Sequence, residues 1–147
     1  MKINITKKEY RILLQMLYLG DWVLNSWVPG ERADTKEHRD LFERLLALAS
    51  GFSCKDLVDE GSDGRHGPSV KLEEHELVRG SIDEYENETF WSLLAERLAE
   101  RDMSREVNEE DYAKMASEER MRLFLSYETK YQEEFERFGI NRLLISA

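Results

Sequence analysis

The feature that most constrains this fold is a segment near the N-terminus, residues 6–27, whose apolar residues recur with the period of an α-helix. One face carries Ile12, Met16, Leu19, Val23 and Trp27, and Leu13, Leu17 and Leu24 lie beside it. A stripe this wide predicts a central helix, about 30 Å long at 1.5 Å per residue, that packs on more than one side.

Both ends of this predicted helix have a local signal. Thr6 followed by Glu9 predicts a capping box, in which each side chain bonds the backbone amide of the other residue. Pro29-Gly30 predicts the end of the helix, because proline cannot continue the hydrogen-bond ladder.

The overall charge restricts the class of partner. The 147 residues include 21 basic and 31 acidic ones, for a net charge of −10. Such a field repels phosphate backbones, so we expect no nucleic-acid partner, whereas a basic protein partner or a cation is compatible with it. A chain of this length predicts a single domain, residues 1–147.

Cysteine usage and hydropathy bear on the compartment. Cys54 is the single cysteine, which excludes an intrachain disulfide and favours a reducing compartment. No apolar run reaches the 18 residues or so that a membrane span requires, so we expect no membrane partner. These features together predict a cytoplasmic protein.

Further helices are predicted along the rest of the chain, and they indicate an all-α fold: a single-domain helical bundle of five to seven helices. Residues 72–86 are ambiguous, because Gly80-Ser81 interrupts a helical pattern, and residues 59–69 read as a surface loop. The expected helices span residues 35–50, 88–103, 109–115 and 118–138, with caps at Asp34, Asn87, Asn108 and Ser117, and with stops at Gly51 and Gly139. Ser53 with Asp56 predicts the start of a further short helix that carries Leu57 and Val58.

The two ends of the chain are strand-like. Residues 2–5 alternate polar and apolar side chains, and residues 142–145 are rich in leucine and isoleucine. This pattern predicts a short two-stranded β-ribbon formed by the termini. Fraying of both ends is the alternative.

The C-terminal half carries a resemblance to a known group of proteins. Two sets of residues carry it: Phe90-Trp91 with Leu94, Arg97-Leu98-Ala99 and Arg101-Asp102, and then Tyr131 with Glu134-Phe135, Gly139-Ile140 and Arg142-Leu143. The pattern resembles a family of small uncharacterised bacterial proteins with no assigned activity. The resemblance therefore implies no catalytic residue, cofactor or partner.

The residues that could hold a metal ion lie between Asp59 and Glu76. His66 and His75 are the candidates, and the acids near them are Asp63, Glu73, Glu74 and Glu76. Their spacing matches no zinc pattern, so we expect solvated histidines. A calcium loop starting at Asp59 would lack two ligands, because Gly61 and Val70 occupy the third and twelfth positions.

The sequence gives little support for nucleophilic catalysis or for phosphate binding. Cys54 stands at a presumed helix start, where a thiol pKa would be lowered, but a small buried cysteine is the more common case. The chain contains no nucleophile elbow and no glycine-rich phosphate-binding motif. We therefore predict no catalytic, cofactor-binding or metal-binding residues and no cofactor.

Three functions remain as hypotheses. The first is a non-enzymatic protein–protein interaction or regulatory module with an acidic surface, in which Trp27 is the candidate interface residue. A homodimer is a further expectation of this hypothesis. The second is a small metal-dependent enzyme that uses the Asp59–Glu76 region. The third is an acidic nucleic-acid mimic, which ranks lower because acids and bases are interleaved on most helices.

Overall fold

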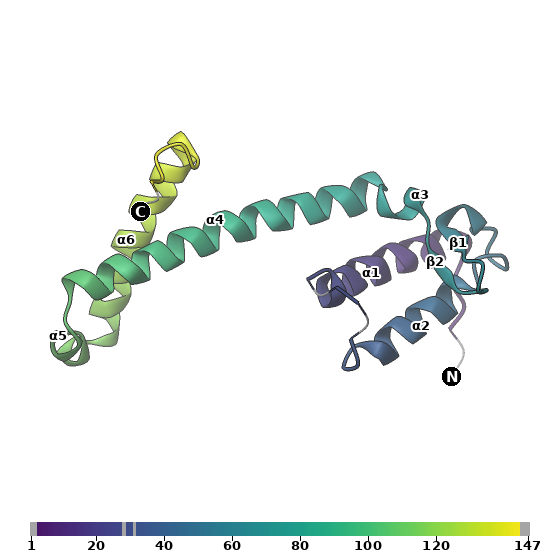
Figure 1. Ribbon diagram of the computed structural model, residues 1–147, viewed down its shortest axis with the longest axis horizontal. Helices are drawn as coiled ribbons and strands as arrows, with labels where there is room; N and C mark the ends of the chain where they lie inside the picture. Colours follow the sequence, from purple (N-terminus) through teal and green to yellow (C-terminus); the bar gives the residue numbers. More distant parts are fainter. Residues whose placement is uncertain (1–2, 28, 31, 145–147) are drawn as a thin grey trace. The chain divides into compact units, whose positions relative to one another are not determined.

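The computed structural model describes residues 3–27, 29–30 and 32–144 (Figure 1). Within these residues the chain forms six α-helices, one 3₁₀-helix and one two-stranded antiparallel sheet, so the prediction of a helical fold with a short β-ribbon is confirmed. In chain order the elements are α1 (Lys7–Asn25), α2 (Lys36–Leu46), η1 (Lys55–Leu57), β1 (Val58–Glu60), β2 (His66–Pro68), α3 (Val70–Glu73), α4 (Glu76–Glu106), α5 (Glu109–Lys114) and α6 (Ser117–Phe138).

The chain divides into two compact units, Met1–Asp83 and Glu84–Ala147. Helix α4 begins in the first unit and continues into the second. The expectation that the whole chain folds as one domain stays a prediction. None of the helices in the described parts of the chain combines the length and the hydrophobicity that crossing a bilayer requires.

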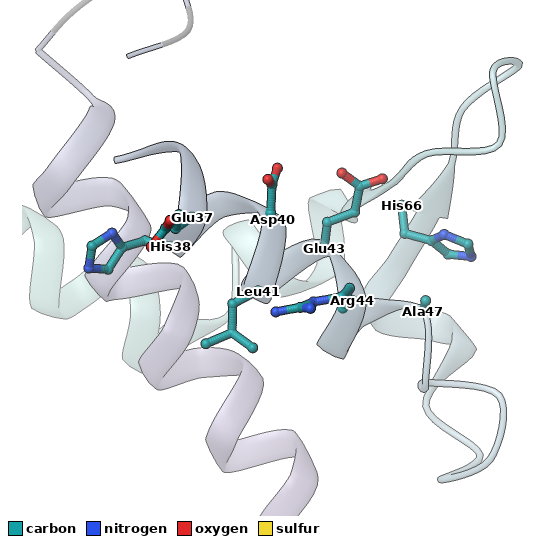
Figure 2. Close-up of a pocket in the computed structure, with 8 residues that line it drawn as sticks. All are labelled: Glu37, His38, Asp40, Leu41, Glu43, Arg44, Ala47 and His66. Carbon is teal, nitrogen blue, oxygen red and sulfur yellow. The ribbon is translucent and has the colours of Figure 1, made fainter. Parts of the chain in front are cut away.

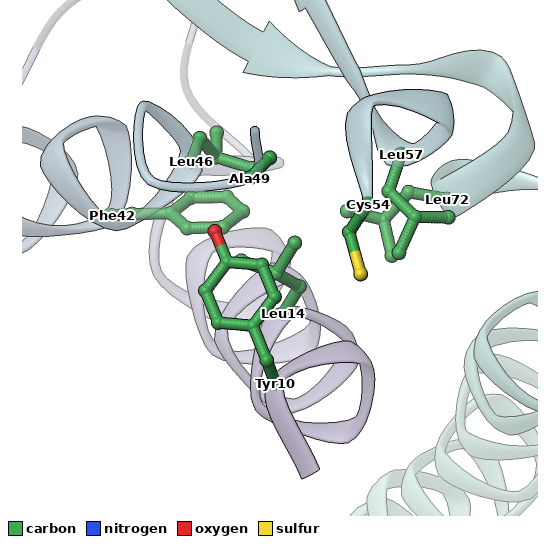
Figure 3. Close-up of a cluster of buried hydrophobic side chains, with 8 residues drawn as sticks. All are labelled: Tyr10, Leu14, Phe42, Leu46, Ala49, Cys54, Leu57 and Leu72. Atoms are coloured by element: carbon green, nitrogen blue, oxygen red, sulfur yellow. The ribbon is translucent and has the colours of Figure 1, made fainter. Parts of the chain in front are cut away.

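The first unit has the larger core, which α1, α2, η1, α3 and the turns between them build (Figure 3). The Tyr10 ring stacks on Phe52 with centroids 4.2 Å apart, and its hydroxyl donates to the Leu45 carbonyl at 2.5 Å. Because this phenol is buried, its pKa is raised to about 12. The buried members of this core are Tyr10, Leu14, Phe42, Leu46, Ala49, Cys54, Leu57 and Leu72.

The start of α1 follows the sequence prediction. Glu9 accepts a hydrogen bond from the Thr6 amide at 2.7 Å, and the Glu9 amide donates to the Thr6 hydroxyl at 3.3 Å. The capping box is therefore confirmed. The helix ends at Asn25, a few residues before Pro29-Gly30.

Helix α2 departs from the prediction at both ends. Its N-cap is Thr35, without a side-chain cap, because Asp34 pairs with Arg32 instead. The helix ends at Leu46 rather than near Ser50, and the predicted stop at Gly51 lies in the turns that follow. Those turns bring Ala49 and Cys54 into the core, where the Ala49 carbonyl accepts from the Cys54 amide at 2.8 Å.

The β-ribbon forms in the segment that the sequence indicated as a surface loop. Strands β1 and β2 pair with Val58 opposite Pro68, and the turn between them places Gly64 at φ +77°, which favours glycine. Asp63 accepts from the Arg65 amide at 3.1 Å and holds the same turn. The terminal ribbon is wrong for the described residues, because residues 3–5 and 142–144 lie in no strand; Lys2 and Ile145 lie outside the described residues.

Three elements of the first unit meet at Asp56 in η1. The carboxylate accepts from the two terminal nitrogens of Arg11 in α1, at 3.1 and 3.2 Å, and from Lys71 in α3 at 2.7 Å. These hydrogen bonds hold the pKa of Asp56 well below its ordinary value. The contact fixes α1, η1 and α3 to one another.

Helix α4 is longer than predicted. Gly80-Ser81 does not interrupt it, and Asn87 is not a cap but an interior residue whose amide oxygen accepts from the Trp91 indole at 3.1 Å. Val78 and Ile82 are buried in this first part of the helix, and burial of apolar side chains offsets the low helix propensity of Gly80.

The second unit is built around α4 and α6. Small side chains, Ala95 and Ala99, are buried on α4, and Phe135 is buried on α6 against the Trp91 ring, with centroids 5.4 Å apart. Tyr131 donates a short hydrogen bond to Asp102, and Arg101 donates to the Tyr131 oxygen at 3.1 Å. The aromatic side chains of Tyr131 and Phe135 on α6 thus contact α4.

For the ends of α5 and α6, two predictions are confirmed and one is wrong. Asn108 caps α5, because its side chain accepts from the Asp111 amide at 2.9 Å, and Gly139 follows α6 at φ +55°, as predicted. Ser117 was expected to cap α6, but Ala116 occupies the cap position and Ser117 is the first helical residue.

Candidate interaction surface

The candidate site is an exposed apolar face of α1. We define the α1 stripe as Ile12, Met16, Leu19 and Val23 on α1 together with Trp27 in the turn that follows it, the residues that the sequence pattern placed in a central, covered position. In the structure Leu19 is partly exposed, and the exposed fractions are 45% for Ile12, 64% for Met16, 53% for Val23 and 75% for Trp27. The expectation that these residues lie in the core is wrong for four of the five.

The opposite face of α1 carries the buried contacts. Tyr10 and Leu14 are fully buried there, and Leu17 and Tyr18 pack partly against the same core. The last turn of α2 and the turns after it decide this choice, because they place the Leu45 carbonyl within reach of the Tyr10 hydroxyl and Phe52 against the Tyr10 ring. Both faces of α1 are apolar, and the core covers one of them.

Gly20 lies among the residues of the α1 stripe, about one helical turn after Met16 and about one turn before Val23. A methyl group added at this glycine would meet no atom within 4 Å. Glycine inside a helix costs roughly 1 kcal/mol relative to alanine, and neither a positive φ nor a close neighbour in the described structure requires it here. The protomer as described therefore supplies no reason for this glycine.

The charges on α1 are arranged unfavourably for an isolated helix. Lys7 and Lys8 occupy its first turn, where the helix dipole is positive, and its last turn contains no basic residue. Glu9 offsets this in part through the capping box. The remaining basic residue of the helix, Arg11, is paired with Asp56.

The histidines of the predicted metal region lie apart in different local environments. His66 lies on β2 and lines a solvent-open hollow of about 800 Å³ against α2 (Figure 2). Figure 2 shows His38 and His66 at opposite ends of this hollow, with Asp40 and Glu43 between them. His75 precedes α4, and its Nδ1 accepts from the Leu77 amide at 3.3 Å, as a helix cap does.

Two acids of the same region, Asp59 and Asp63, belong to the β-hairpin. Asp63 holds the hairpin turn, and Asp59 lies in β1 opposite Gly67, in an extended conformation unlike a calcium loop. Among the residues that the structure describes, no group of three or more His, Cys, Asp or Glu side chains is placed to hold a metal ion.

Cys54 is fully buried and its thiol donates to the Phe52 carbonyl at 3.3 Å. This is the arrangement of a small core residue, so the prediction of a buried cysteine is confirmed. A substrate in solvent has no access to its sulfur.

The negative charge is unevenly divided between the two units. Residues 1–83 contain 12 basic and 15 acidic residues, a net charge of −3, and residues 84–147 contain 9 and 16, a net charge of −7. Within the second unit many acids stand beside bases on the same helix, as in the pair of Arg97 with Glu100 at 2.9 Å. Sequence composition alone could not locate this asymmetry, because it depends on where the units divide.

Comparison with known proteins found no matching family model, no matching curated protein and no matching solved structure. The residues and their geometry are therefore the basis for assigning a function.

Proposed function

We propose that this protein is a non-enzymatic interaction module, in which the α1 stripe anchors a protein partner and the negative field of the chain favours basic partners. The observation that carries the proposal is the exposure of Met16 and Val23 on a helix whose other face already packs on a core, and of Trp27 in the turn that follows this helix. Large apolar side chains gathered on one exposed face are typical of protein-binding surfaces.

The residue types support this proposal. Tryptophan and methionine are enriched at the centres of interfaces, where a large side chain can be fully desolvated. Trp27 is the most exposed of the three tryptophans, with Trp22 and Trp91 partly covered. The net charge of −10 would speed encounter with a basic partner and would make that encounter sensitive to salt.

A capture experiment tests the proposal. The wild-type chain, Met16→Glu and Leu41→Glu are immobilised and exposed to lysate of the source cells at low and at high salt. Leu41 is the matched control, because it is a 47% exposed leucine on α2, outside the α1 stripe. Wild type and Leu41→Glu should retain the same partner, Met16→Glu should lose most of it, and high salt should weaken the capture.

Two results would contradict the proposal. Equal capture by wild type and Met16→Glu would remove the α1 stripe from binding, and capture that does not respond to salt would remove the electrostatic part.

The metal-dependent enzyme is addressed by a separate measurement. Bound metal is determined in the purified wild-type chain and in His66→Ala and His75→Ala. Stoichiometric metal that is lost in both variants would overturn the proposal of a non-enzymatic module and would favour a metal site in the Asp59–Glu76 region.

A further inference from the structure

We infer that the occupant of the α1 stripe is a second copy of this chain, paired so that the two α1 helices run antiparallel and cross at Leu19 and Gly20. This inference rests on the proposed function of the α1 stripe, because it uses the same surface and names its occupant. The preference for basic partners is not part of it, because a second copy carries the same net charge of −10.

The stripe is self-complementary about its middle. Ile12 and Trp27 lie equally far from the midpoint between Leu19 and Gly20, and so do Met16 and Val23. A two-fold axis at that midpoint would place Ile12 against Trp27 of the second copy and Met16 against Val23 of the second copy. Such a symmetric, self-matching patch is what a homodimer interface requires.

Gly20 lies at the centre of this arrangement. The space around it is open in the protomer, with no atom within 4 Å of an added methyl group. At a helix crossing, the missing side chain lets a second backbone approach closely, as small residues do where helices pack tightly. An antiparallel pair therefore supplies the reason for a glycine that the described protomer does not explain.

The lysines of α1 also bear on the orientation of the pair. In the antiparallel pair centred between Leu19 and Gly20, Lys7 and Lys8 of the two copies would lie at opposite ends of the contact. A parallel pair would bring the four lysines together. Charge therefore favours the antiparallel arrangement over the parallel one.

The available area predicts a weak dimer. From their exposed fractions, the stripe side chains would contribute on the order of 500 Å² per copy, close to the lower limit of specific protein interfaces. We therefore expect a dissociation constant in the micromolar range or weaker.

Sedimentation velocity tests the pairing. The wild-type chain is measured from about 1 to about 500 micromolar, and its mass should rise from one copy towards two over this range. Met16→Glu, with the charge placed inside the contact, should weaken association by about tenfold or more. Circular dichroism of each variant confirms that the helices are retained.

Glycine variants distinguish a specific helix crossing from non-specific association. Gly20→Leu adds apolar surface to the stripe, so non-specific association would become stronger, whereas a close crossing at Gly20 predicts weaker association. Gly80→Leu is the matched control, because Gly80 is also helical and also has no atom within 4 Å of an added methyl group. This control should dimerise like the wild type, and stronger association of Gly20→Leu would contradict the inference.

Disulfide crosslinking tests the orientation. In the antiparallel pair Leu19→Cys lies near the axis and should crosslink to itself, whereas Ile12→Cys should crosslink only when it is mixed with Trp27→Cys. Because native Cys54 is buried, the wild-type chain should not crosslink and serves as the negative control. Efficient self-crosslinking of Ile12→Cys would indicate a parallel pair and would contradict the antiparallel arrangement.

These experiments distinguish a failure of the homodimer from a failure of the proposed function. If the stripe binds a different protein, the chain will sediment as a monomer at every concentration, while capture of that protein stays sensitive to Met16→Glu. That result overturns the pairing of two copies and leaves the interaction module in place. A monomer without Met16-dependent capture would overturn both.

Discussion

The Thr35 hydroxyl donates a hydrogen bond of 2.6 Å to the Asn25 side-chain oxygen, and both residues are buried. Asn25 in turn donates to Asp21 at 2.7 Å. These hydrogen bonds join the end of α1 to the start of α2.

We predict that Thr35→Val destabilises the protein by about 1–3 kcal/mol, because the buried Asn25 oxygen loses its donor while the shape of the side chain is kept. Thr35→Ser restores the hydroxyl and should recover most of that loss. Urea unfolding of the three proteins measures the difference. Equal stability of Thr35→Val and wild type would mean that the hydrogen bond does not determine the α1–α2 junction.

The two faces of α1 should respond very differently to truncation. Leu14→Ala removes a fully buried side chain and should cost about 2–5 kcal/mol, whereas Met16→Ala should stay within about 0.5 kcal/mol of wild type. Unfolding is followed at low protein concentration, where any dimer is dissociated. A large cost at Met16 under these conditions would show that the stripe is buried within a single chain.

Asp56 should make the protein sensitive to acid. Its pKa is lowered in the folded state, first by the hydrogen bonds from Arg11 and then by Lys71, so its stabilisation is fully present above its ordinary pKa of 3.8 and is lost as the pH falls through the lowered value. Asp56→Asn should cost at most about 1 kcal/mol at neutral pH, because solvent screens this half-exposed group.

Unfolding midpoints at neutral pH and near pH 3 check this prediction, since the cost of Asp56→Asn should shrink in acid. Asp40→Asn is the control, because Asp40 makes one longer contact with Lys36, at 3.7 Å. A pH-independent cost for Asp56→Asn would contradict an electrostatic origin.

Gly80 inside α4 and Gly139 just after α6 should respond in opposite directions to alanine. Gly80→Ala should stabilise by about 0.5–1 kcal/mol, because Gly80 is exposed inside α4 with open space around it. Gly139→Ala should destabilise by about 1–3 kcal/mol, because φ +55° with ψ −137° strains any residue with a side chain. Thermal unfolding of both variants measures the pair. A change of the same sign at both sites would contradict the backbone conformations described.

The hydrogen bond between Tyr131 and Asp102 should contribute to the stability of the second unit. Tyr131→Phe removes the main cause of the lowered pKa of Asp102, so that pKa should rise and the unit should lose about 1 kcal/mol. Tyr112→Phe is the control, because its ring keeps the contact with the Arg120 guanidinium and its loss should be within about 0.5 kcal/mol. Nuclear magnetic resonance titration of Asp102 measures the pKa, and an unchanged value in Tyr131→Phe would count against the bond.

The sequence by itself determined the features that a few neighbouring residues control. The capping box of Thr6 and Glu9, the Asn108 cap and the glycine after α6 each depend on contacts within about one helical turn, so their signals are local and were predicted correctly. The helical class of the fold follows from the same period of apolar residues.

Tertiary structure decided which apolar face of α1 became core, where the ribbon formed and how far α4 extends. Tyr10 is held by Phe52 and by the Leu45 carbonyl, partners more than thirty residues away that no local pattern could identify. The same holds for α4, where buried Val78 and Ile82 support a helix through Gly80. Periodicity shows that a face is apolar, but the contacts of distant residues determine whether that face is covered, and so the α1 stripe could be recognised as exposed only in the folded chain.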